Sequence, residues 1–319
     1  MSTTTTAPVE ASTTSACPTL GAHQVHPLTR GGARGRLWQC RGCGLVGWTE
    51  TWTAAQARQH YAGYYHPVEI TYDPLTEQRY HAFLSECERL TPGRRLLDIG
   101  CGAGHLLAVS AARGWQATGV EVSSSALEAL DRLQRERGVR FTVVSDDLAR
   151  ASLPAGRMDV VSLVEVIEHL GNPLAALQES HRLLSDRGLL YLTTPNYDSV
   201  SRRLLGCRWR VIAPEHQSLL SPRTLRTYLQ AAGFRPLRMT TKNIDVVEIL
   251  AKWRRQAAPP AGQTRQAAQG LRHAVEERAW LRGLKHLING CLRWTQLGDT
   301  IEVLAMKEPP AHDALCSTG

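Results

Sequence analysis

Two carboxylates and two imidazoles are the side chains of this sequence best suited to do chemistry. Glu165, Glu168 and His169 in the stretch EVIEHL follow an apolar run, and their i, i+3, i+4 spacing predicts one shared face if a helix starts there. These three side chains suit a divalent ion such as Mg²⁺, and His216 in PEHQSL offers a fourth ligand from another loop. The alternative is a metal-free site in which His169, His216 or Glu168 is catalytic, with an imidazole as general base.

A second candidate site is the stretch LLDIGCGAGHLL, where an apolar strand runs into an acid and three glycines. Asp98 precedes Gly100, Gly102 and Gly104, and such glycines let backbone N–H groups approach a ligand where the next helix starts. A dinucleotide site needs a third small residue at the position that His105 occupies. No Lys-Ser/Thr pair follows the glycines, so the pattern also excludes a phosphate-binding loop.

The acids at successive strand ends indicate a cationic nucleoside ligand. Asp98 would repel a pyrophosphate and attract an ammonium group. S-adenosylmethionine carries both an amino group and a sulfonium. A second predicted strand, residues 116–120, ends in Glu121, which could accept hydrogen bonds from ribose hydroxyls. A third strand leads to Asp146 and Asp147, either of which could accept from the adenine amino group.

Four ordered stretches, LLDIGCGAG, GVEVS, VVSDDL and MDVVSLVEVIEHL, closely resemble the class I S-adenosylmethionine-dependent methyltransferases. The resemblance covers about residues 96–307. Later stretches, RLLSDRGLLYLTTPN and APEHQSLLSPRTLRTYLQAAGF, are similar to the branch that contains the ubiquinone-biosynthesis O-methyltransferases. The resemblance implies that the cofactor-binding residues are Asp98, Gly100, Cys101, Gly102, Gly104, Glu121, Val122, Asp146, Asp147 and Val164.

The resemblance also bears on the acceptor. Ubiquinone O-methyltransferases carry a matching ExxEH motif, and the small-RNA 3′-terminal 2′-O-methyltransferases have a similar motif with a later histidine. In both groups the resemblance implies a metal that holds a vicinal diol. We therefore expect O-methylation of a small molecule, such as a specialised metabolite, a cofactor precursor or a sugar. The alternatives are RNA 2′-O-methylation, transfer to carbon, or an inactive binding module, against which the intact cofactor motif argues.

The fold expected from these patterns is α/β, a doubly wound and mostly parallel seven-stranded sheet of the Rossmann-like class I type. Near-continuous apolar runs such as residues 160–164 suit strands that are covered on both faces. The last strand is expected at residues 300–306, antiparallel to a strand that begins near Pro236. Ser125 with Glu128 predicts a capping box at one helix start.

A small cysteine-rich ribbon is expected before this sheet. Cys40 and Cys43 have CxxC spacing in LWQCRGCGLV, and Cys17 lies upstream without the second cysteine that would complete a pair. His23 or His26 could supply the fourth ligand, because zinc accepts imidazole nitrogen as well as thiolate. The alternative is a degenerate ribbon held by packing alone. Related methyltransferases often carry such a ribbon, which implies a substrate-side lid or an anchoring role.

Length and composition agree with one main domain and additions. The chain has 319 residues, 43% of them hydrophobic, and a formal net charge of +8. The expected organisation is a disordered tail at 1–16, a zinc-ribbon-like segment at 17–50, a helical lid at 51–90, the methyltransferase domain at 91–308 and a tail at 309–319. Tyr61, Tyr64, Tyr65 and Tyr72 fall in or near the lid, where packing is the favoured role for each.

A basic helical insertion is expected at residues 252–293, before the last strand. It holds nine Lys or Arg against two Glu, a local excess of seven. Leu284, Leu287, Ile288 and Cys291 have helical spacing and predict an amphipathic helix. This segment is either a solvated helix or the binding surface for an anionic partner, such as nucleic acid or a phosphorylated carrier. We found neither a secretory signal nor a membrane-spanning stretch, and a cytoplasmic location is expected.

Overall fold

The structure is a computed structural model, and it describes residues 17, 19–21, 23–28, 37–62, 74–148, 150–253 and 279–309. Some sequence predictions lie outside these residues: the tail at 1–16, the tail after Pro309, the lid tyrosines Tyr64, Tyr65 and Tyr72, and residues 254–278 of the basic insertion.

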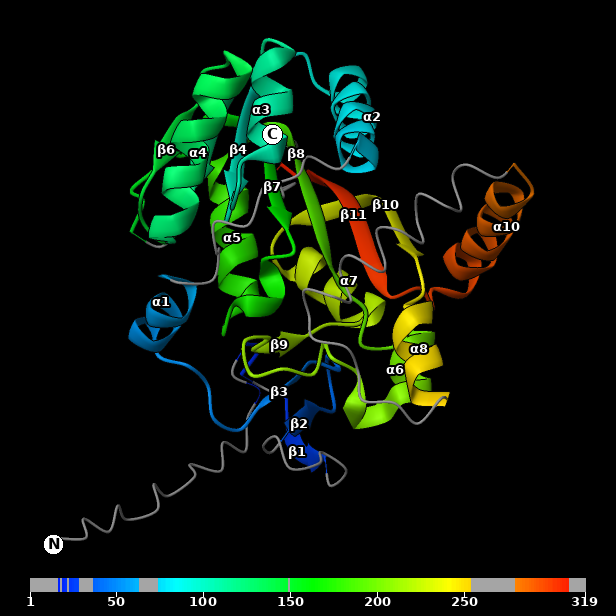
Figure 1. Cartoon of the computed structure of the whole chain (residues 1–319). Coiled ribbons are helices and arrows are strands. Elements are labelled where there is room, and N and C mark those ends of the chain that lie inside the picture. The colour runs from blue at the N-terminus through cyan, green and yellow to red at the C-terminus, as the bar shows by residue number, and fades with distance from the viewer. Residues whose placement is uncertain are drawn as a thin grey trace, which may run out of the picture.

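A seven-stranded sheet forms the centre of the molecule (Figure 1). Its strand order is β10-β11-β8-β7-β4-β5-β6, and all neighbouring pairs are parallel except those that β11 makes with β8 and β10. The strands are β4 Arg95–Ile99, β5 Gln116–Val120, β6 Thr142–Val144, β7 Met158–Val164, β8 Leu184–Pro195, β10 Phe234–Lys242 and β11 Thr300–Lys307. The doubly wound sheet and the antiparallel last strand are therefore confirmed.

Helices cover both faces of this sheet, because its inner strands are apolar on both sides. One core joins Leu97 and Val161 of the strands to Leu177 and Tyr228 of the helices, and the other core joins strands to α2 and α3. The helices are α1 Ala54–Ala62, α2 Pro74–Leu90, α3 His105–Ala112, α4 Ser124–Arg137, α5 Pro173–Leu183, α6 Val200–Leu205, α7 Pro222–Ala231, α8 Val246–Trp253 and α10 Ala279–Thr295. Two 3-10 helices, η1 Ile167–His169 and η2 Gly206–Arg208, complete the described helical elements.

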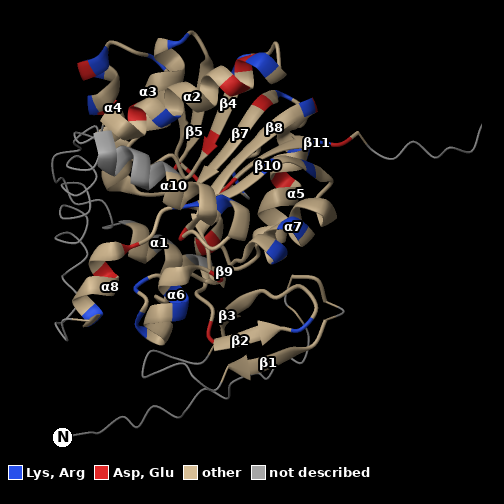
Figure 2. Cartoon of the chain, turned by 90° about the vertical axis from the view of Figure 1, so that its right-hand side faces the viewer, with Lys and Arg blue, Asp and Glu red and all other residues tan. Residues whose placement is uncertain are grey.

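A second, four-stranded sheet holds the N-terminal segment, in the order β1-β2-β3-β9. Its strands are β1 Val25–Leu28, β2 Leu37–Cys40, β3 Val46–Trp48 and β9 Ser218–Leu219. The last of these belongs to the sequence between α6 and α7, so a strand from far along the chain closes the small sheet. Figure 2 shows this sheet beneath the main one, with β9 on the side that faces it.

One local prediction needs correction, and another is confirmed. The helix α4 is capped by Ser123, whose side chain accepts from the amide of Ala126, and not by Ser125. The helix α10 confirms the helix that was predicted within the basic insertion, and it runs to Thr295. Leu287 and Ile288 of this helix are 66% and 42% exposed, whereas Leu292 is buried. Among the described helices, none is long and apolar enough to cross a membrane.

Candidate functional site

The three glycines after β4 adopt the backbone that their motif requires. Gly100, Gly102 and Gly104 have φ angles of 64°, 51° and 77°, in the left-handed region that glycine reaches without strain. A Cβ atom on Gly100 would lie 2.7 Å from Cγ2 of Val166. Gly104 is also the N-cap of α3. The turn therefore presents backbone N–H groups at the carboxyl end of β4, beside a helix N-terminus.

Asp98 lies at this edge of the sheet and is 4% exposed. The register of β4 and β7 pairs it with Ser162, whose hydroxyl donates to Oδ1 of Asp98 at 2.7 Å. Burial raises the pKa of Asp98 to about 7, although the Ser162 hydrogen bond opposes the shift. A buried carboxylate of this kind gains most from a cationic partner, since an opposite charge offsets the desolvation.

Glu121 holds the glycine turn through its own carboxylate. Oε2 accepts from the amide of Gly102, and Oε1 accepts from the amides of Val122 and Ser123, each at 2.8 Å. A carboxylate offers about four lone-pair positions, so one of them is left after these three bonds. The free lone-pair position on Glu121 can therefore accept a hydrogen bond from one ribose hydroxyl, whereas the sequence suggested that Glu121 accepts from both.

The remaining cofactor candidates lie at neighbouring strand ends. Asp146 follows β6 and accepts from the amide of Asp147 at 2.8 Å, while Asp147 caps its own loop through the amide of Arg150. Val164 ends β7, and Cys101 lies within the glycine turn. All of them therefore sit at the carboxyl edge of β4, β5, β6 and β7. In open α/β sheets, ligands bind at this edge, where the strand order reverses.

A second cluster lies after β7, where ligand atoms of Glu168, His169 and His216 are all within 4.8 Å of one another. Glu168 and His169 belong to η1, and His216 comes from the loop before β9. Oε1 of Glu168 is 4.0 Å from Nε2 of His169, and the two imidazole rings have centroids 4.7 Å apart. The structure thus brings together three of the four residues that the sequence proposed as magnesium ligands.

Glu165 does not belong to this cluster. The predicted helical face is wrong, because β7 ends at Val164 and Glu165 takes a left-handed φ of 55°. Only the single turn of η1 follows, and the next α-helix starts at Pro173. The i, i+3 spacing therefore does not bring Glu165 onto the face of Glu168 and His169.

Backbone carbonyls orient both imidazoles. Nδ1 of His216 lies 2.7 Å from the carbonyl oxygen of Val211, and Nδ1 of His169 lies 3.1 Å from that of Glu215. A donated Nδ1–H leaves Nε2 as the free lone pair, which is the arrangement usual for histidines that bind metals. Burial lowers the pKa of both histidines, that of His169 to about 4, so the neutral ligand form prevails at neutral pH.

Glu168 is buried, and its Oε2 accepts from the hydroxyl of Thr194 at 3.0 Å. Burial, and then the nearby Glu165, raise the pKa of Glu168 well above its ordinary value. A cation beside it would favour the ionised form. The donor set is therefore two neutral imidazoles and one carboxylate, which suits a divalent ion of borderline to hard character.

Sequence reasoning missed three residues of these sites. The hydroxyl of Tyr61 lies 2.7 Å from Nδ1 of His169, although packing was the favoured role for that side chain. Ser162 was visible only as a lone hydroxyl in an apolar strand, and Thr194 only as part of the TPN stretch. His181 of α5 lies outside these sites and packs edge-on against Phe234.

The three cysteines that the sequence predicts as zinc ligands also lie close together in the structure. Sulfur atoms of Cys17, Cys40 and Cys43 lie within 4.8 Å of one another, and all three side chains are buried. Neither His23 nor His26, the two histidines considered for the fourth position, is part of that group.

Comparison with known proteins agrees with the fold. A family model described as a methyltransferase domain matches residues 74–238, just over half of the chain. The ubiquinone biosynthesis O-methyltransferase of Pseudomonas aeruginosa (strain LESB58) is 31% identical over 133 residues, which are 41% of this chain and 55% of the relative. The enzyme of the same name from Idiomarina loihiensis is 28% identical over 186 residues, 50% of this chain and 74% of the relative.

The match to the first of these curated relatives spans about half of the relative's length. Among solved structures, a putative sarcosine dimethylglycine methyltransferase from Galdieria sulphuraria superposes with a TM-score of 0.50 at 16% identity. It covers 73% of this chain and 85% of its own, and it supports the fold alone. Together with the glycine turn and the strand order, the family match places the chain among the class I S-adenosylmethionine-dependent methyltransferases.

Proposed function

We propose that this methyltransferase transfers the methyl group of S-adenosylmethionine to a hydroxyl of a small molecule, with a divalent metal ion beside the acceptor. The observation that carries the proposal is the group of buried Glu168 and half-buried His169 and His216, next to the carboxyl edge of the sheet. The names of the curated relatives support the choice of oxygen as acceptor.

We assign the cofactor to the edge formed by β4, β5 and β6. In this assignment, Asp98 receives the amino group of the methionine moiety, Glu121 accepts one ribose hydroxyl and Asp146 accepts from the adenine amino group. Asp147 is tied to Arg150 in its own loop, which favours Asp146 for that role. Gly100, Gly102 and Gly104 keep the backbone close to the ligand, and Cys101, Val122 and Val164 line it.

We assign Glu168, His169 and His216 to the metal. When bound, the ion would hold a vicinal diol of the acceptor and make one hydroxyl more acidic. Mg²⁺ prefers oxygen ligands and keeps several waters, so the diol and water would complete a set with two imidazoles. Nothing in this assignment requires Glu165.

The chain's own residues then supply alignment. Displacement at a methyl carbon needs the nucleophile in line with the sulfonium, and alignment alone corresponds to effective molarities of order 10⁵ to 10⁸ M. Tyr61 from α1 contacts His169, so this helix covers the acceptor side of the site. We accordingly propose that residues 51–90 act as a helical lid on a methyltransferase domain at 91–308, and that residues 17–50 form a zinc-ribbon-like addition.

The proposal is tested by assaying methyl transfer to a panel of catechols and other vicinal diols with Mg²⁺, Mn²⁺ or EDTA. Glu168→Gln should lower kcat at least about 10²-fold, because it removes the charged ligand. Glu179→Gln is the control, since Glu179 pairs with Arg182 on the outer side of α5. Transfer that is equally fast in EDTA would refute the metal and leave a metal-free histidine base.

A further inference from the structure

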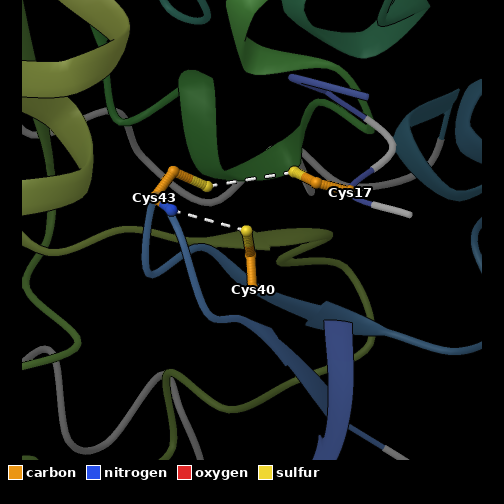
Figure 3. Close-up of side chains that lie close together, drawn as sticks. All are labelled: Cys17, Cys40 and Cys43. Atoms are coloured by element: carbon orange, nitrogen blue, oxygen red, sulfur yellow. Dashed lines mark hydrogen bonds between the residues drawn. The ribbon is translucent and has the colours of Figure 1, made fainter. Parts of the chain in front are cut away.

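Three buried cysteines from separate parts of the N-terminal segment converge on one point (Figure 3). Cys17 precedes β1, Cys40 ends β2, and Cys43 lies in the turn that follows. Sγ of Cys17 and Sγ of Cys43 are 3.9 Å apart, far beyond the ~2.05 Å of a disulfide. The cluster is therefore a set of thiols that face one another.

The sulfur spacing matches a tetrahedral metal site. Zinc binds thiolate at about 2.3 Å, which places two sulfurs of a tetrahedron about 3.8 Å apart. The amide of Cys43 donates to Sγ of Cys40 at 3.4 Å, and the hydroxyl of Tyr228 lies 3.6 Å from Sγ of Cys43. Donors of this kind stabilise the negative charge of thiolates around a metal and orient them.

His23 lies against the turn that carries Cys40 and Cys43, although outside the group of three sulfurs. Its ring packs on Gly42 in the Cys40–Cys43 turn, where a Cβ atom would lie 2.5 Å from Nδ1. This Nδ1 is buried and has no hydrogen-bond partner among the described residues. The backbone carbonyl oxygen of His23 accepts a hydrogen bond from the amide of Cys17 at 2.6 Å. Cys17 and His23 therefore lie in one small loop. A buried imidazole nitrogen without a described partner, on the turn that carries two of the three thiols, makes His23 the candidate for the fourth ligand.

The ribbon is connected directly to the proposed metal-binding loop of the methyltransferase domain. β3 pairs with β9 through Val46 and Leu219, and β9 begins two residues after His216. Nε1 of Trp48 donates to the carbonyl oxygen of His216 at 3.0 Å. The amide of Trp52 donates to Oε1 of Gln217 at 2.8 Å.

A further bond ties β9 to the other half of that site. The hydroxyl of Ser218 donates to the carbonyl oxygen of Leu170, the residue that follows η1. The small sheet thus holds the backbone of His216 on one side and contacts the segment of His169 on the other. The position of β3 is therefore coupled through hydrogen bonds to the backbone segments that carry the two imidazoles.

We propose that Cys17, Cys40, Cys43 and His23 bind one structural Zn²⁺, and that this ion fixes the ribbon so that Trp48 and β9 hold His216 beside His169. The first half of the proposal stands on the cysteine cluster alone. The second half rests on the proposed function, because it concerns the position of a ligand of the catalytic metal. Zinc therefore acts here as a positioning element, away from the methyl group.

The zinc half is tested on the full-length protein by metal analysis after purification and by substitution with Co²⁺. We expect about one zinc per chain and the intense absorption of tetrahedral cobalt thiolate. Cys40→Ser should abolish both readouts and His23→Ala should lower zinc affinity at least tenfold. Cys207→Ser, which changes an exposed cysteine of η2, should change neither. Wild-type protein without stoichiometric zinc and without the cobalt thiolate spectrum would overturn the assignment.

The positioning half is tested with Trp48→Phe, which removes the hydrogen bond to His216 and leaves the four zinc ligands in place. We expect full zinc content, unchanged affinity for S-adenosylhomocysteine and Mn²⁺ affinity at the catalytic cluster that is weaker by several-fold. Unchanged Mn²⁺ affinity would refute the coupling while zinc remains. If wild-type protein binds zinc and the cofactor but no Mn²⁺ at the cluster, the proposed metal-dependent function fails and the zinc site stands.

Discussion

Asp98 and Ser162 illustrate how two residues far apart in sequence produce one ligand-binding group. Their pairing across β4 and β7 gives the buried carboxylate one hydroxyl partner, and its pKa rises to about 7 because burial outweighs that bond. The acid before the glycines could be predicted from the motif. Its hydroxyl partner depends on strand register, which the sequence pattern does not specify.

Affinity for S-adenosylhomocysteine should therefore depend on pH. In the proposed assignment the ligand's ammonium group binds the ionised Asp98, so binding would lower the raised pKa and would require loss of a proton below about pH 7. The affinity is expected to be full above pH 8 and to fall towards tenfold per unit as the pH drops below 7. Tyr80 and Glu121 interact electrostatically with the carboxyl group of Asp98, and neither residue is changed in the variants used to test this pH dependence.

Calorimetric titration between pH 6 and pH 8.5 checks this expectation. Asp98→Asn should bind more weakly at every pH and should lose the dependence. Asp131→Asn, a change on the exposed face of α4, should behave as wild type. An unaltered pH profile in Asp98→Asn would show that another group binds the ammonium.

At the scale of elements, strands and glycine turns were predictable, and their ends were less so. The strand at 116–120 and the antiparallel final strand were confirmed, because apolar runs and strand-end acids mark them clearly. The start of α4 was misplaced by two residues, since Ser123, Ser124 and Ser125 are all suitable caps in sequence. The conformation of Glu165 was missed because a left-handed residue after a strand leaves no mark in side-chain spacing.

Two glycines with similar φ angles, Gly100 in the glycine turn after β4 and Gly114 outside it, allow the role of that turn to be tested. Gly100→Ala must accept a φ of 64° and a contact of 2.7 Å with Val166. Gly114→Ala accepts a φ of 78° with no atom within 4 Å of the new Cβ. We expect about 1 kcal/mol of destabilisation at Gly114 from the backbone alone, and more at Gly100.

Thermal unfolding and cofactor titration measure the two effects. Gly100→Ala should have the lower Tm and should bind S-adenosylhomocysteine at least tenfold more weakly. Equal Tm values and equal affinities in the two variants would mean that the close approach to Val166 does not shape the turn.

The outer strands β10 and β11 carry an ion-pair network whose loss should be visible in acid. Lys242 and Arg238 on β10 pair with Glu302 on β11, and they lower the pKa of Glu302 to about 2 against the opposing effect of burial. A depressed pKa stabilises the fold above the ordinary value of 4.5, and this stability is lost as the pH falls towards 2.

Glu302→Gln removes the titrating group. Its free energy of unfolding should be lower than wild type at pH 6, and the gap should narrow between about pH 4.5 and pH 2. Glu308→Gln alters an exposed pair with Arg235 and serves as the control, with little change expected at any pH. A constant gap across this range would mean that the charge of Glu302 does not stabilise the strands. Denaturant titrations at several pH values supply the comparison.

At the scale of the whole molecule, the way the N-terminal ribbon joins the methyltransferase domain could not be predicted. The strand β9 has only two residues and pairs with a segment more than 160 positions earlier, so no local pattern reveals it. The cysteines were recognised by spacing, whereas their closeness to Tyr228 and the link from Trp48 to His216 arise only in the folded chain. The arrangement places both proposed metal sites at the two ends of one small sheet.

Identification of the methylated product is the sharpest test of metal-dependent O-methylation. Full-length protein is incubated with S-adenosylmethionine, a catechol and Mg²⁺, and the product is analysed by mass spectrometry and NMR. We predict a methyl ether on one of the two adjacent hydroxyls of the catechol. The product should form with Mg²⁺, and it should not form in EDTA or with the Glu168→Gln variant. Intact binding of S-adenosylhomocysteine with no methyl ether from any vicinal diol, or a methyl group found on carbon, would contradict it.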